Sequence, residues 1–376
     1  MRGPAVKTIV IAAGGTGGHF FPAEALAAEL VARGHRVVLM TDGRSGALNS
    51  AVFAGCEQHV LYGAGIAGRG VVRGAKAIVS LAAGVVQARR LLSHLGASAV
   101  IGFGGYPCVA PVLAASLLRR RPAVILQEQN AVLGRANRFL AGRADVLALS
   151  FEGTTRVPAD VEAIVTGNPV RSSFVKLAAV DYVAPSDRIR LAILGGSLGA
   201  RVFSDIVPAA LGSLPPGLRD RLSVVQQCRP EDLDRVRSAY AASGIQAELA
   251  SFFPDVADRL AAAHLVISRA GAATVSELAV AGRPSILVPL PGAIDDHQTA
   301  NARALDQAGG AILMPQPQFT VASLAGRLNR LLSSPEWLAT ASAAARGQAR
   351  ADAAVRLADV VEARISLDMV RAGERT

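Results

Sequence analysis

The residues most able to do chemistry lie near the start of the chain, in a glycine-rich run that ends in a histidine. Residues 14–19 read GGTGGH, after an apolar stretch at 8–13 and before a helical pattern at 23–31. This order predicts a strand, a tight turn and a helix. Glycines let backbone N–H groups approach a ligand, and a helix N-terminus attracts anions, so the turn suits a phosphate or pyrophosphate. His19 at its edge is placed to take a proton from a reacting hydroxyl.

Two common phosphate-binding patterns do not describe this run. A dinucleotide fingerprint would need glycine where the chain has Phe20, and a P-loop would need a Gly-Lys-Ser/Thr ending. A merely tight turn between strand and helix stays open as the alternative.

The strand and glycine-turn unit occurs again half-way along the chain. Residues 189–194 (IRLAIL) run into GGSLGA at 195–200, and a third glycine-rich turn, GFGGYPC, occupies 102–108. The repeat predicts two similar α/β domains in tandem, each with a parallel, doubly wound sheet. The predicted strands are 8–13, 36–41, 99–103, 123–127, 146–149, 163–166, 189–194, 223–226, 265–268, 285–288 and 311–313. The Asn-Pro pair at 168–169 marks the predicted boundary, and the ligand site is expected between the domains.

Composition agrees with this fold class. Hydrophobic residues make up 51% of the 376 residues and aromatic residues only 4%, which suits parallel sheets that helices cover on both faces. The three cysteines form no metal-binding pattern, so we expect reduced thiols, a cytosolic setting and no structural zinc. No signal peptide is recognisable before the first predicted strand.

Glu128 is the carboxylate in the amide-rich run QEQN at 127–130. It is a candidate general base, and a structural counter-ion is an equal alternative. Because no second acid accompanies it, the paired-carboxylate chemistry of a glycosidase is disfavoured.

The second half offers a donor-like site at a predicted strand end. Residues 268–277 (SRAGAATVSE) predict a helix whose first turn accepts an anion, with Glu277 either on a ribose diol or complementing the helix dipole. The amides and imidazole at 297–301 suit sugar hydroxyls. The one Asp-x-Asp, at 232–234, is interpreted as the solvated start of a helix at 231–241, so no metal or other cofactor is expected. Helix dipoles and N–H groups would then stabilise a departing diphosphate.

Charge is concentrated in one region. Residues 63–144 hold eleven Arg and Lys and one carboxylate, a difference of +10 that equals the net charge of the whole chain. Apolar residues alternate with these bases, whereas aromatics for base stacking are nearly absent, so an anionic membrane surface is favoured over nucleic acid. The alternative is that these basic residues form the solvated face of ordinary amphipathic helices. The uncharged stretch 97–118 contains too many glycines and prolines to read as a membrane span.

Seven segments together resemble the MurG family of N-acetylglucosaminyltransferases. They are 14–22, 102–107, 128–130, 166–171, 195–201, 268–277 and 296–302. The resemblance implies a glycosyltransferase-B fold with two Rossmann-like domains: 1–169 for acceptor and membrane, 170–345 for UDP-GlcNAc, and a helix at 346–376 returning to the first domain. It implies inverting, metal-independent transfer of GlcNAc from UDP-GlcNAc to the 4-hydroxyl of undecaprenyl-pyrophosphoryl-MurNAc-pentapeptide. The expected location is the cytoplasmic face of the bacterial inner membrane.

The resemblance also implies roles for individual residues. His19 is the first choice for general base and Glu128 the second. The implied donor-binding residues are Thr16, Gly17, Gly18, Asn130, Arg171, Ser197, Phe253, Ala272, Ala273, Thr274, Val275, Ser276, Glu277, Gln298 and Asn301. The implied acceptor-binding residues are Gly14, Gly15, Gly104, Gly105, Tyr106 and Asn137.

The chain departs from the family pattern at two places. Gln127 stands where members often have histidine or another residue, and 226–229 read QQCR where many have a His-Gln-(Ser/Thr)-Gly-like segment. These differences put the uracil-side contacts in question, but not the reaction class. Three other functions stay open: transfer to another lipid acceptor, UDP-GlcNAc 2-epimerisation, and a non-catalytic nucleotide-binding membrane adaptor.

Overall fold

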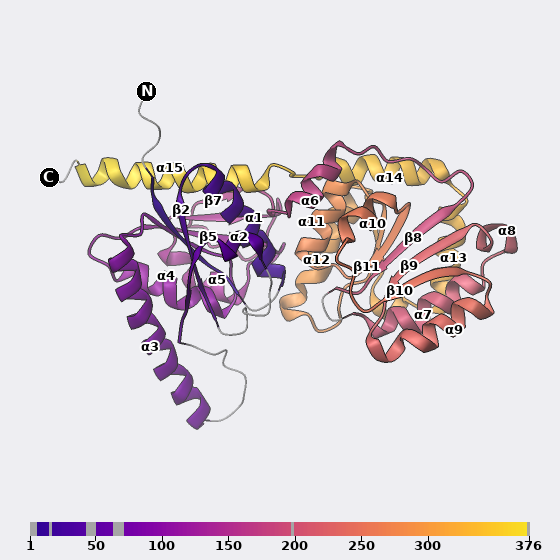
Figure 1. Ribbon diagram of the computed structural model, residues 1–376, viewed down its shortest axis with the longest axis horizontal. Coiled ribbons are helices and arrows are strands. Elements are labelled where there is room, and N and C mark those ends of the chain that lie inside the picture. Colours follow the sequence, from indigo (N-terminus) through magenta and orange to yellow (C-terminus); the bar gives the residue numbers. More distant parts are fainter. Residues whose placement is uncertain (1–5, 15–16, 43–49, 63–70, 197–198, 374–376) are drawn as a thin grey trace. The chain divides into compact units, whose positions relative to one another are not determined.

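The computed structural model describes residues 6–14, 17–42, 50–62, 71–196 and 199–373, with side chains omitted at 71–77 and 368–373 (Figure 1). The chain divides into two compact units. Unit 1 comprises residues 1–171 and 352–376, and unit 2 comprises 172–351. The predicted boundaries followed residues 169 and 345; the second of these lies within helix α14 (Pro335–Gly347), which belongs to unit 2.

Unit 1 is built on a seven-stranded parallel sheet in the order β3-β2-β1-β4-β5-β6-β7. The strands are β1 (Thr8–Ala12), β2 (Arg36–Thr41), β3 (Glu57–Val60), β4 (Ala99–Gly102), β5 (Ala123–Glu128), β6 (Val146–Leu149) and β7 (Ala163–Val165). The order reverses between β1 and β4, which pair in register from Ile9 with Ala99 to Ala12 with Gly102. The loops after β1 and β4 therefore meet at a topological switch point, where open α/β sheets bind ligands.

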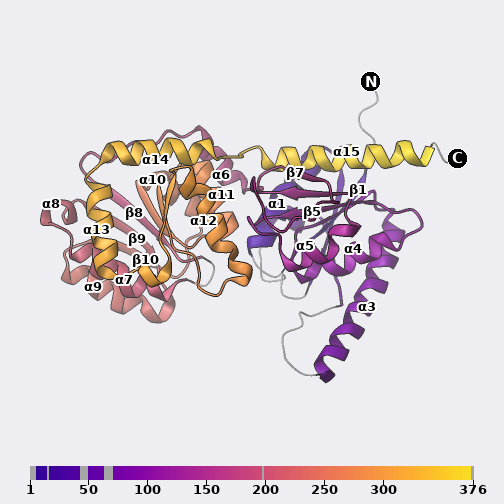
Figure 2. The same ribbon diagram turned by 180° about the vertical axis from the view of Figure 1, so that it is seen from behind.

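Helices cover both faces of this sheet with apolar side chains. They are α1 (Gly17–Ala32), α2 (Ala51–Ala54), α3 (Val71–Leu95), α4 (Val109–Ser116), α5 (Arg135–Leu140) and α15 (Ala353–Gly373). Helices α1, α2 and α15 share one core cluster with the sheet, and α3, α4 and α5 share the other; Figure 2 shows α3 beside α4. Arg33, directly after α1, fixes α15 through 2.7 Å ion pairs with Asp359 and Glu362.

Unit 2 repeats the plan with a six-stranded parallel sheet in the order β10-β9-β8-β11-β12-β13. The strands are β8 (Ile189–Leu194), β9 (Leu222–Gln227), β10 (Gln246–Ala250), β11 (Leu265–Ser268), β12 (Ser285–Leu287) and β13 (Ala311–Leu313). Its switch point lies between β8 and β11, which pair from Leu265 with Leu191 to Ser268 with Leu194. The predicted fold class, two doubly wound α/β units, is confirmed.

The remaining helices complete unit 2. They are α6 (Ser172–Val175), α7 (Arg201–Gly212), α8 (Pro216–Arg219), α9 (Leu233–Ala242), α10 (Val256–Ala262), α11 (Ala272–Ala281), α12 (His297–Gln307), α13 (Val321–Leu332) and α14. Helices α7, α9 and α13 pack on one sheet face in a single core cluster. Short 3₁₀ turns precede several helices, among them η2 (Tyr106–Cys108) before α4.

Residues 97–118, rejected as a membrane span, form β4, η2 and α4. Across the part of the chain that the structure describes, none of the helices combines the length and hydropathy needed to cross a bilayer.

Candidate functional site

The switch point of unit 1 brings His19 against the glycine-rich turn at 102–108. A Cβ added to Gly104 would lie 3.6 Å from His19 Cε1, and one added to Gly105 would lie 3.5 Å from His19 Nε2. Both glycines have positive φ, 79° and 67°, a conformation that residues with a side chain rarely adopt. The imidazole thus lies on bare backbone, and two turns predicted separately form one site. Gly14 is buried at the end of β1, whereas Gly15 and Thr16 lie outside the described residues.

His19 is held on one side by Gln129. Its Nδ1 lies 2.8 Å from Gln129 Oε1, while Gln129 Nε2 donates to the carbonyl oxygen of Phe103 at 2.9 Å. Gln129 is buried and His19 is half-buried. The histidine is therefore fixed through Nδ1, and the other ring nitrogen, Nε2, is the one beside Gly105.

Glu128 is a saturated carboxylate at the end of β5. Its Oε1 accepts from the backbone N–H of Asn130 at 2.9 Å and from Asn130 Nδ2 at 3.1 Å. Its Oε2 accepts from the backbone N–H of Gly134 at 2.8 Å and from Asn137 Nδ2 at 2.9 Å. With 2% of its surface exposed and each oxygen engaged twice, this group organises the loop after β5. The arrangement favours His19 over Glu128 as the group free to move a proton.

Tyr106 and Asn137, both predicted to contact the acceptor, lie in the same region of unit 1. Asn137 is buried, and its Nδ2 also donates to the carbonyl oxygen of Gln127 at 3.1 Å. Within the described chain, Asn137 Oδ1 and the Tyr106 hydroxyl have no hydrogen-bond partner. Burial raises the pKa of Tyr106, so the phenol stays a neutral donor. One unused acceptor and one unused donor near His19 are suitable for a polar ligand.

Two further predicted residues lie near the start of α1. Gly17 and Gly18 form its first turn, ahead of His19. The Arg171 guanidinium stacks over the Phe21 ring, 4.6 Å from its centroid. This cation–π contact holds Arg171, the last residue of the first segment of unit 1, against the helix that carries His19.

At the switch point of unit 2, two amide side chains grip the backbone that leads into α11. Gln298 Oε1 accepts from the backbone N–H groups of Ala270 at 3.3 Å and Leu290 at 2.9 Å. The buried Asn301 donates to the Ala270 carbonyl oxygen at 3.1 Å. The two residues predicted to bind sugar hydroxyls thus also position the N-terminus of α11.

At some positions in the first turn of α11, only backbone groups could contact a ligand. Ala272 and Val275 are buried in the core, so any donor contact there would be made by their backbone. Ala273, Thr274, Ser276 and Glu277 are partly exposed. The helix begins after Gly271, and the N–H groups of its first turn have no intrahelical acceptor. This end of the helix is suited to a diphosphate.

The loop after β8 closes on itself so tightly that glycine is required. A Cβ on Gly195 would lie 2.3 Å from the backbone nitrogen of Ala200. Gln227 fixes this loop by accepting from the Gly195 N–H at 3.1 Å and donating to the carbonyl oxygens of Gly196 at 2.9 Å and Ser251 at 3.2 Å. Ser197 lies outside the described residues. Within 226–229, Gln227 is the residue that agrees with the family pattern, and it shapes the loop after β8.

Arg269 is a residue of the 268–277 segment to which the sequence assigned no role. It donates to the carbonyl oxygens of Val288 and Pro289, each at 3.1 Å, and to Gln316 Oε1 at 2.7 Å. These bonds tie the end of β11 to the loop after β12. Burial lowers its pKa.

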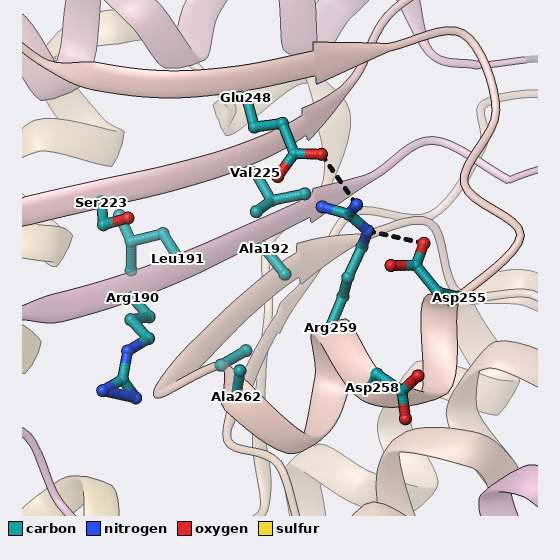
Figure 3. Close-up of a pocket in the computed structure, with 11 residues that line it drawn as sticks. Arg190, Leu191, Ala192, Ser223, Val225, Glu248, Asp255, Asp258, Arg259 and Ala262 are labelled. Atoms are coloured by element: carbon teal, nitrogen blue, oxygen red, sulfur yellow. Dashed lines mark hydrogen bonds and ion pairs between the residues drawn. The ribbon is translucent and has the colours of Figure 1, made fainter.

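A cavity of about 310 Å³ opens on the β8–β10 face beside α10 (Figure 3). Arg259 lines it and pairs at 2.8 Å with Glu248 and with Asp255. The same guanidinium lies 4.0 Å from the centroid of the ring of Phe253, a buried residue predicted to bind the donor. None of the predicted site residues lines the cavity.

The two carboxylates of the Asp-x-Asp pair bind different arginines and do not face a shared site. Asp232 pairs with Arg235 at 2.8 Å, and the exposed Asp234 pairs with Arg237 at 2.7 Å. In the portion of the chain described, no cluster of three or more His, Cys, Asp or Glu is arranged to hold a metal ion.

Several residues of the basic region are exposed, on α3 and just beyond the end of α4 at Ser116. Ile78 and Val79 on α3 are 69% and 68% exposed, and Arg89, Arg90, Arg119 and Arg120 are exposed as well. Arg121 pairs at 2.8 Å with Asp145, a carboxylate just beyond the segment counted in the sequence, so one of the bases is neutralised locally.

Comparison with known proteins identifies the family. Residues 9–148 match the glycosyltransferase family 28 N-terminal domain, and residues 190–357 match the C-terminal domain. The crystal structure of Acinetobacter baumannii MurG superposes with a TM-score of 0.78 at 31% identity, covering 95% of this chain and 99% of that one. A relative from Granulibacter bethesdensis is 60% identical over 99% of this chain and 97% of its own length. This chain belongs to the MurG family of glycosyltransferases.

A second MurG-family relative, from Acidiphilium cryptum, is 55% identical over 96% of this chain and 98% of its own. Both relatives are named UDP-N-acetylglucosamine--N-acetylmuramyl-(pentapeptide) pyrophosphoryl-undecaprenol N-acetylglucosamine transferase. The predicted glycosyltransferase activity is confirmed at the level of the family. An epimerase, a non-catalytic adaptor and a transferase for another lipid are not favoured.

Proposed function

We propose that this enzyme transfers GlcNAc from UDP-GlcNAc to the 4-hydroxyl of undecaprenyl-pyrophosphoryl-MurNAc-pentapeptide, with inversion at the anomeric carbon. The observation that carries the proposal is near full-length identity of 60% to a relative named for this reaction. The geometry of both switch points supports it, since unit 1 offers a base beside glycine backbone and unit 2 offers a helix N-terminus for a diphosphate.

In the proposed mechanism, His19 Nε2 removes the proton of the acceptor hydroxyl as its oxygen attacks the anomeric carbon. The bond from that carbon to the β-phosphate oxygen breaks, and its electron pair leaves with UDP. The N–H groups of the first turn of α11 stabilise the departing charge, which is a role that a metal ion plays in other transferases. Glu277 and the partly exposed Thr274 and Ser276 complete the proposed donor site, with Asn130 and Arg171 contributing from unit 1.

The acceptor is proposed to lie against the glycine turns of unit 1. Gly14, Gly104 and Gly105 would approach its pyrophosphate, and Tyr106 and Asn137 would use their unpartnered polar atoms on it. The assignment of acceptor to unit 1 and donor to unit 2 is part of the same proposal.

We further infer that α3 and the end of α4 dock on an anionic membrane, on its cytoplasmic side. Exposed Ile78 and Val79 would insert among lipid headgroups while the neighbouring arginines meet their charge. Cosedimentation with anionic vesicles should fall several-fold for the Ile78→Asp, Val79→Asp double variant. Val183→Asp, an equally exposed change in unit 2, should bind as the wild type does.

The reaction is tested with radiolabelled UDP-GlcNAc, the lipid-linked muramyl pentapeptide and EDTA. Label should appear in the lipid at the same rate with and without EDTA. Labelled UDP-GlcNAc that binds without transfer to this lipid would contradict the proposal, and conversion of UDP-GlcNAc alone to UDP-ManNAc would replace it with epimerisation.

A further inference from the structure

The hydrogen bonds around Gln129 determine which nitrogen of His19 carries the proton. A primary amide has donors only on nitrogen and acceptors only on oxygen. Gln129 Nε2 faces three acceptors: the carbonyl oxygens of Phe103 at 2.9 Å and of Gln127 at 3.4 Å, and Gln127 Oε1. The amide nitrogen belongs on that side, so Gln129 Oε1 faces His19.

The consequence for the imidazole follows from the same chemistry. Gln129 Oε1 carries no hydrogen, so the 2.8 Å bond to His19 forms only when Nδ1 is the donor. In the neutral ring the lone pair then belongs to Nε2, which is the nitrogen beside Gly105.

We propose that Gln129 is a positioning residue. It keeps His19 in the tautomer whose Nε2 can take the proton from the 4-hydroxyl of the acceptor substrate. The proposal rests on the proposed function of His19 as general base. As the oxygen–hydrogen bond of the 4-hydroxyl breaks, its proton goes to Nε2, while Nδ1–H continues to donate to Gln129. The oxygen's electrons form the new glycosidic bond, and UDP leaves with the electron pair of the bond that it loses.

The second glutamine, Gln127, supports the first. Its Nε2 donates to Ser150 Oγ at 3.0 Å, and Ser150 donates to the Glu128 carbonyl oxygen at 2.7 Å. This turns Gln127 Oε1 towards Gln129. All of these groups are buried, and the network ends on main-chain carbonyls of β5 and the loop after β4, which do not reorient as side chains do.

An amide differs from a carboxylate in this position. A carboxylate beside Nδ1 would favour the charged imidazolium and hold the proton on the ring. The neutral Gln129 orients the ring through Nδ1 without adding a charge beside it.

The test is the protonation pattern of the His19 ring nitrogens, measured by ¹⁵N NMR of the full-length protein at neutral pH, with His19→Ala identifying the signal among six histidines. In the wild type the proton should be on Nδ1. In Gln129→Met, which keeps the length of the side chain and removes its polar atoms, both tautomers should appear and kcat should fall about tenfold, equivalent to about 1.4 kcal/mol. KM for both substrates should change less than twofold.

Gln58→Met, the same exchange on β3 of unit 1, is the matched control and should change neither the ring signals nor kcat. Gln127→Leu removes one acceptor of Gln129 but leaves the Phe103 carbonyl in place, so it should shift the tautomer less than Gln129→Met does. This milder variant provides the test if Gln129→Met folds poorly. A wild-type proton on Nε2, or an unchanged ring in both variants, would overturn the inference. A proton on Nδ1 together with full activity of His19→Ala would instead refute the base role and leave the tautomer assignment standing.

Discussion

At the switch point of unit 1 the polar groups belong to side chains, whereas at that of unit 2 they belong largely to the backbone. In unit 1 the side chain of His19 bonds to that of Gln129, and the Asn137 amide donates to the Glu128 carboxylate. In unit 2, Gln298, Asn301 and Gln227 are turned towards main-chain atoms and hold the loops in shape. Under the proposed function, the same strand arrangement would support proton transfer in one unit and anion binding in the other. Side-chain changes should disable the first, and changes in backbone geometry the second.

The largest effect is expected from His19→Ala. Removal of the proposed base should lower kcat about 10²- to 10⁴-fold, measured by transfer of label into lipid. His59→Ala is the control, because His59 lies on β3 and pairs with Glu57 at 2.8 Å, and it should retain activity. A residual rate within tenfold of the wild type would mean that another group takes the proton.

Glu128→Gln separates an organising carboxylate from a base. The amide would place N–H donors against the donors of Asn130, Gly134 or Asn137, so the free energy of unfolding should fall by about 1.5–3 kcal/mol. Activity should fall together with stability, and the shape of the pH–rate profile should not change. Complete loss of transfer at unchanged stability would assign the proton to Glu128 instead.

Gly195→Ala tests the backbone side of the comparison. The added methyl would lie 2.3 Å from the Ala200 nitrogen, so the loop must shift and UDP affinity should fall roughly 10- to 100-fold, or about 1.4–2.8 kcal/mol. Gly217→Ala on α8 has open space around its Cβ and should bind UDP normally. Equal UDP affinity of the two variants would show that this loop does not shape the donor site.

The smallest effect concerns a histidine of unit 2 away from its switch point. His264 accepts from the Arg190 N–H at 3.0 Å, and burial lowers its pKa to about 4. Because the unfolded chain takes up this proton below about pH 6.5, stability should fall as pH decreases from 6.5 to 4 and then level off. Thermal unfolding should show this slope in the wild type and a shallower one in His264→Asn. If stability changed with pH equally in both proteins, His264 would not contribute to the loss of stability in acid.

Most of the fold was predictable because buried parallel strands carry continuous apolar runs. Strands β2, β6, β8, β11 and β13 have the predicted bounds, and the others that were predicted differ by one residue at one or both ends. The sequence missed β3 and β10, which are edge strands. Neither strand contains a fully buried residue, and their sequences, EQHV and QAELA, lack the continuous apolar run of the central strands. Pairing with β2 and β9 therefore defines them.

The glycine turns were also predictable, because their backbone demands leave few residue choices. The roles of the amides were not: Gln129 and Gln227 were visible in the quoted segments, but their partners Phe103 and Ser251 lie about 25 residues away in sequence. An amide donates and accepts equally well, so its function depends on which groups the fold places beside it. The same applies to Glu128. Whether it acts as a general base or as a structural group depends on which donors the fold places around its carboxylate.

The central claim is that unit 1 takes the acceptor's proton and unit 2 binds the donor. The most direct test is to titrate UDP calorimetrically into His19→Ala and Gly195→Ala and to measure the transfer of label into lipid by both variants. We predict that His19→Ala binds UDP within twofold of the wild type while its kcat for transfer is about 10²- to 10⁴-fold lower, even at saturating UDP-GlcNAc. Gly195→Ala should lose affinity but recover transfer when UDP-GlcNAc is raised to saturation. Loss of UDP affinity in His19→Ala equal to that in Gly195→Ala would contradict the account.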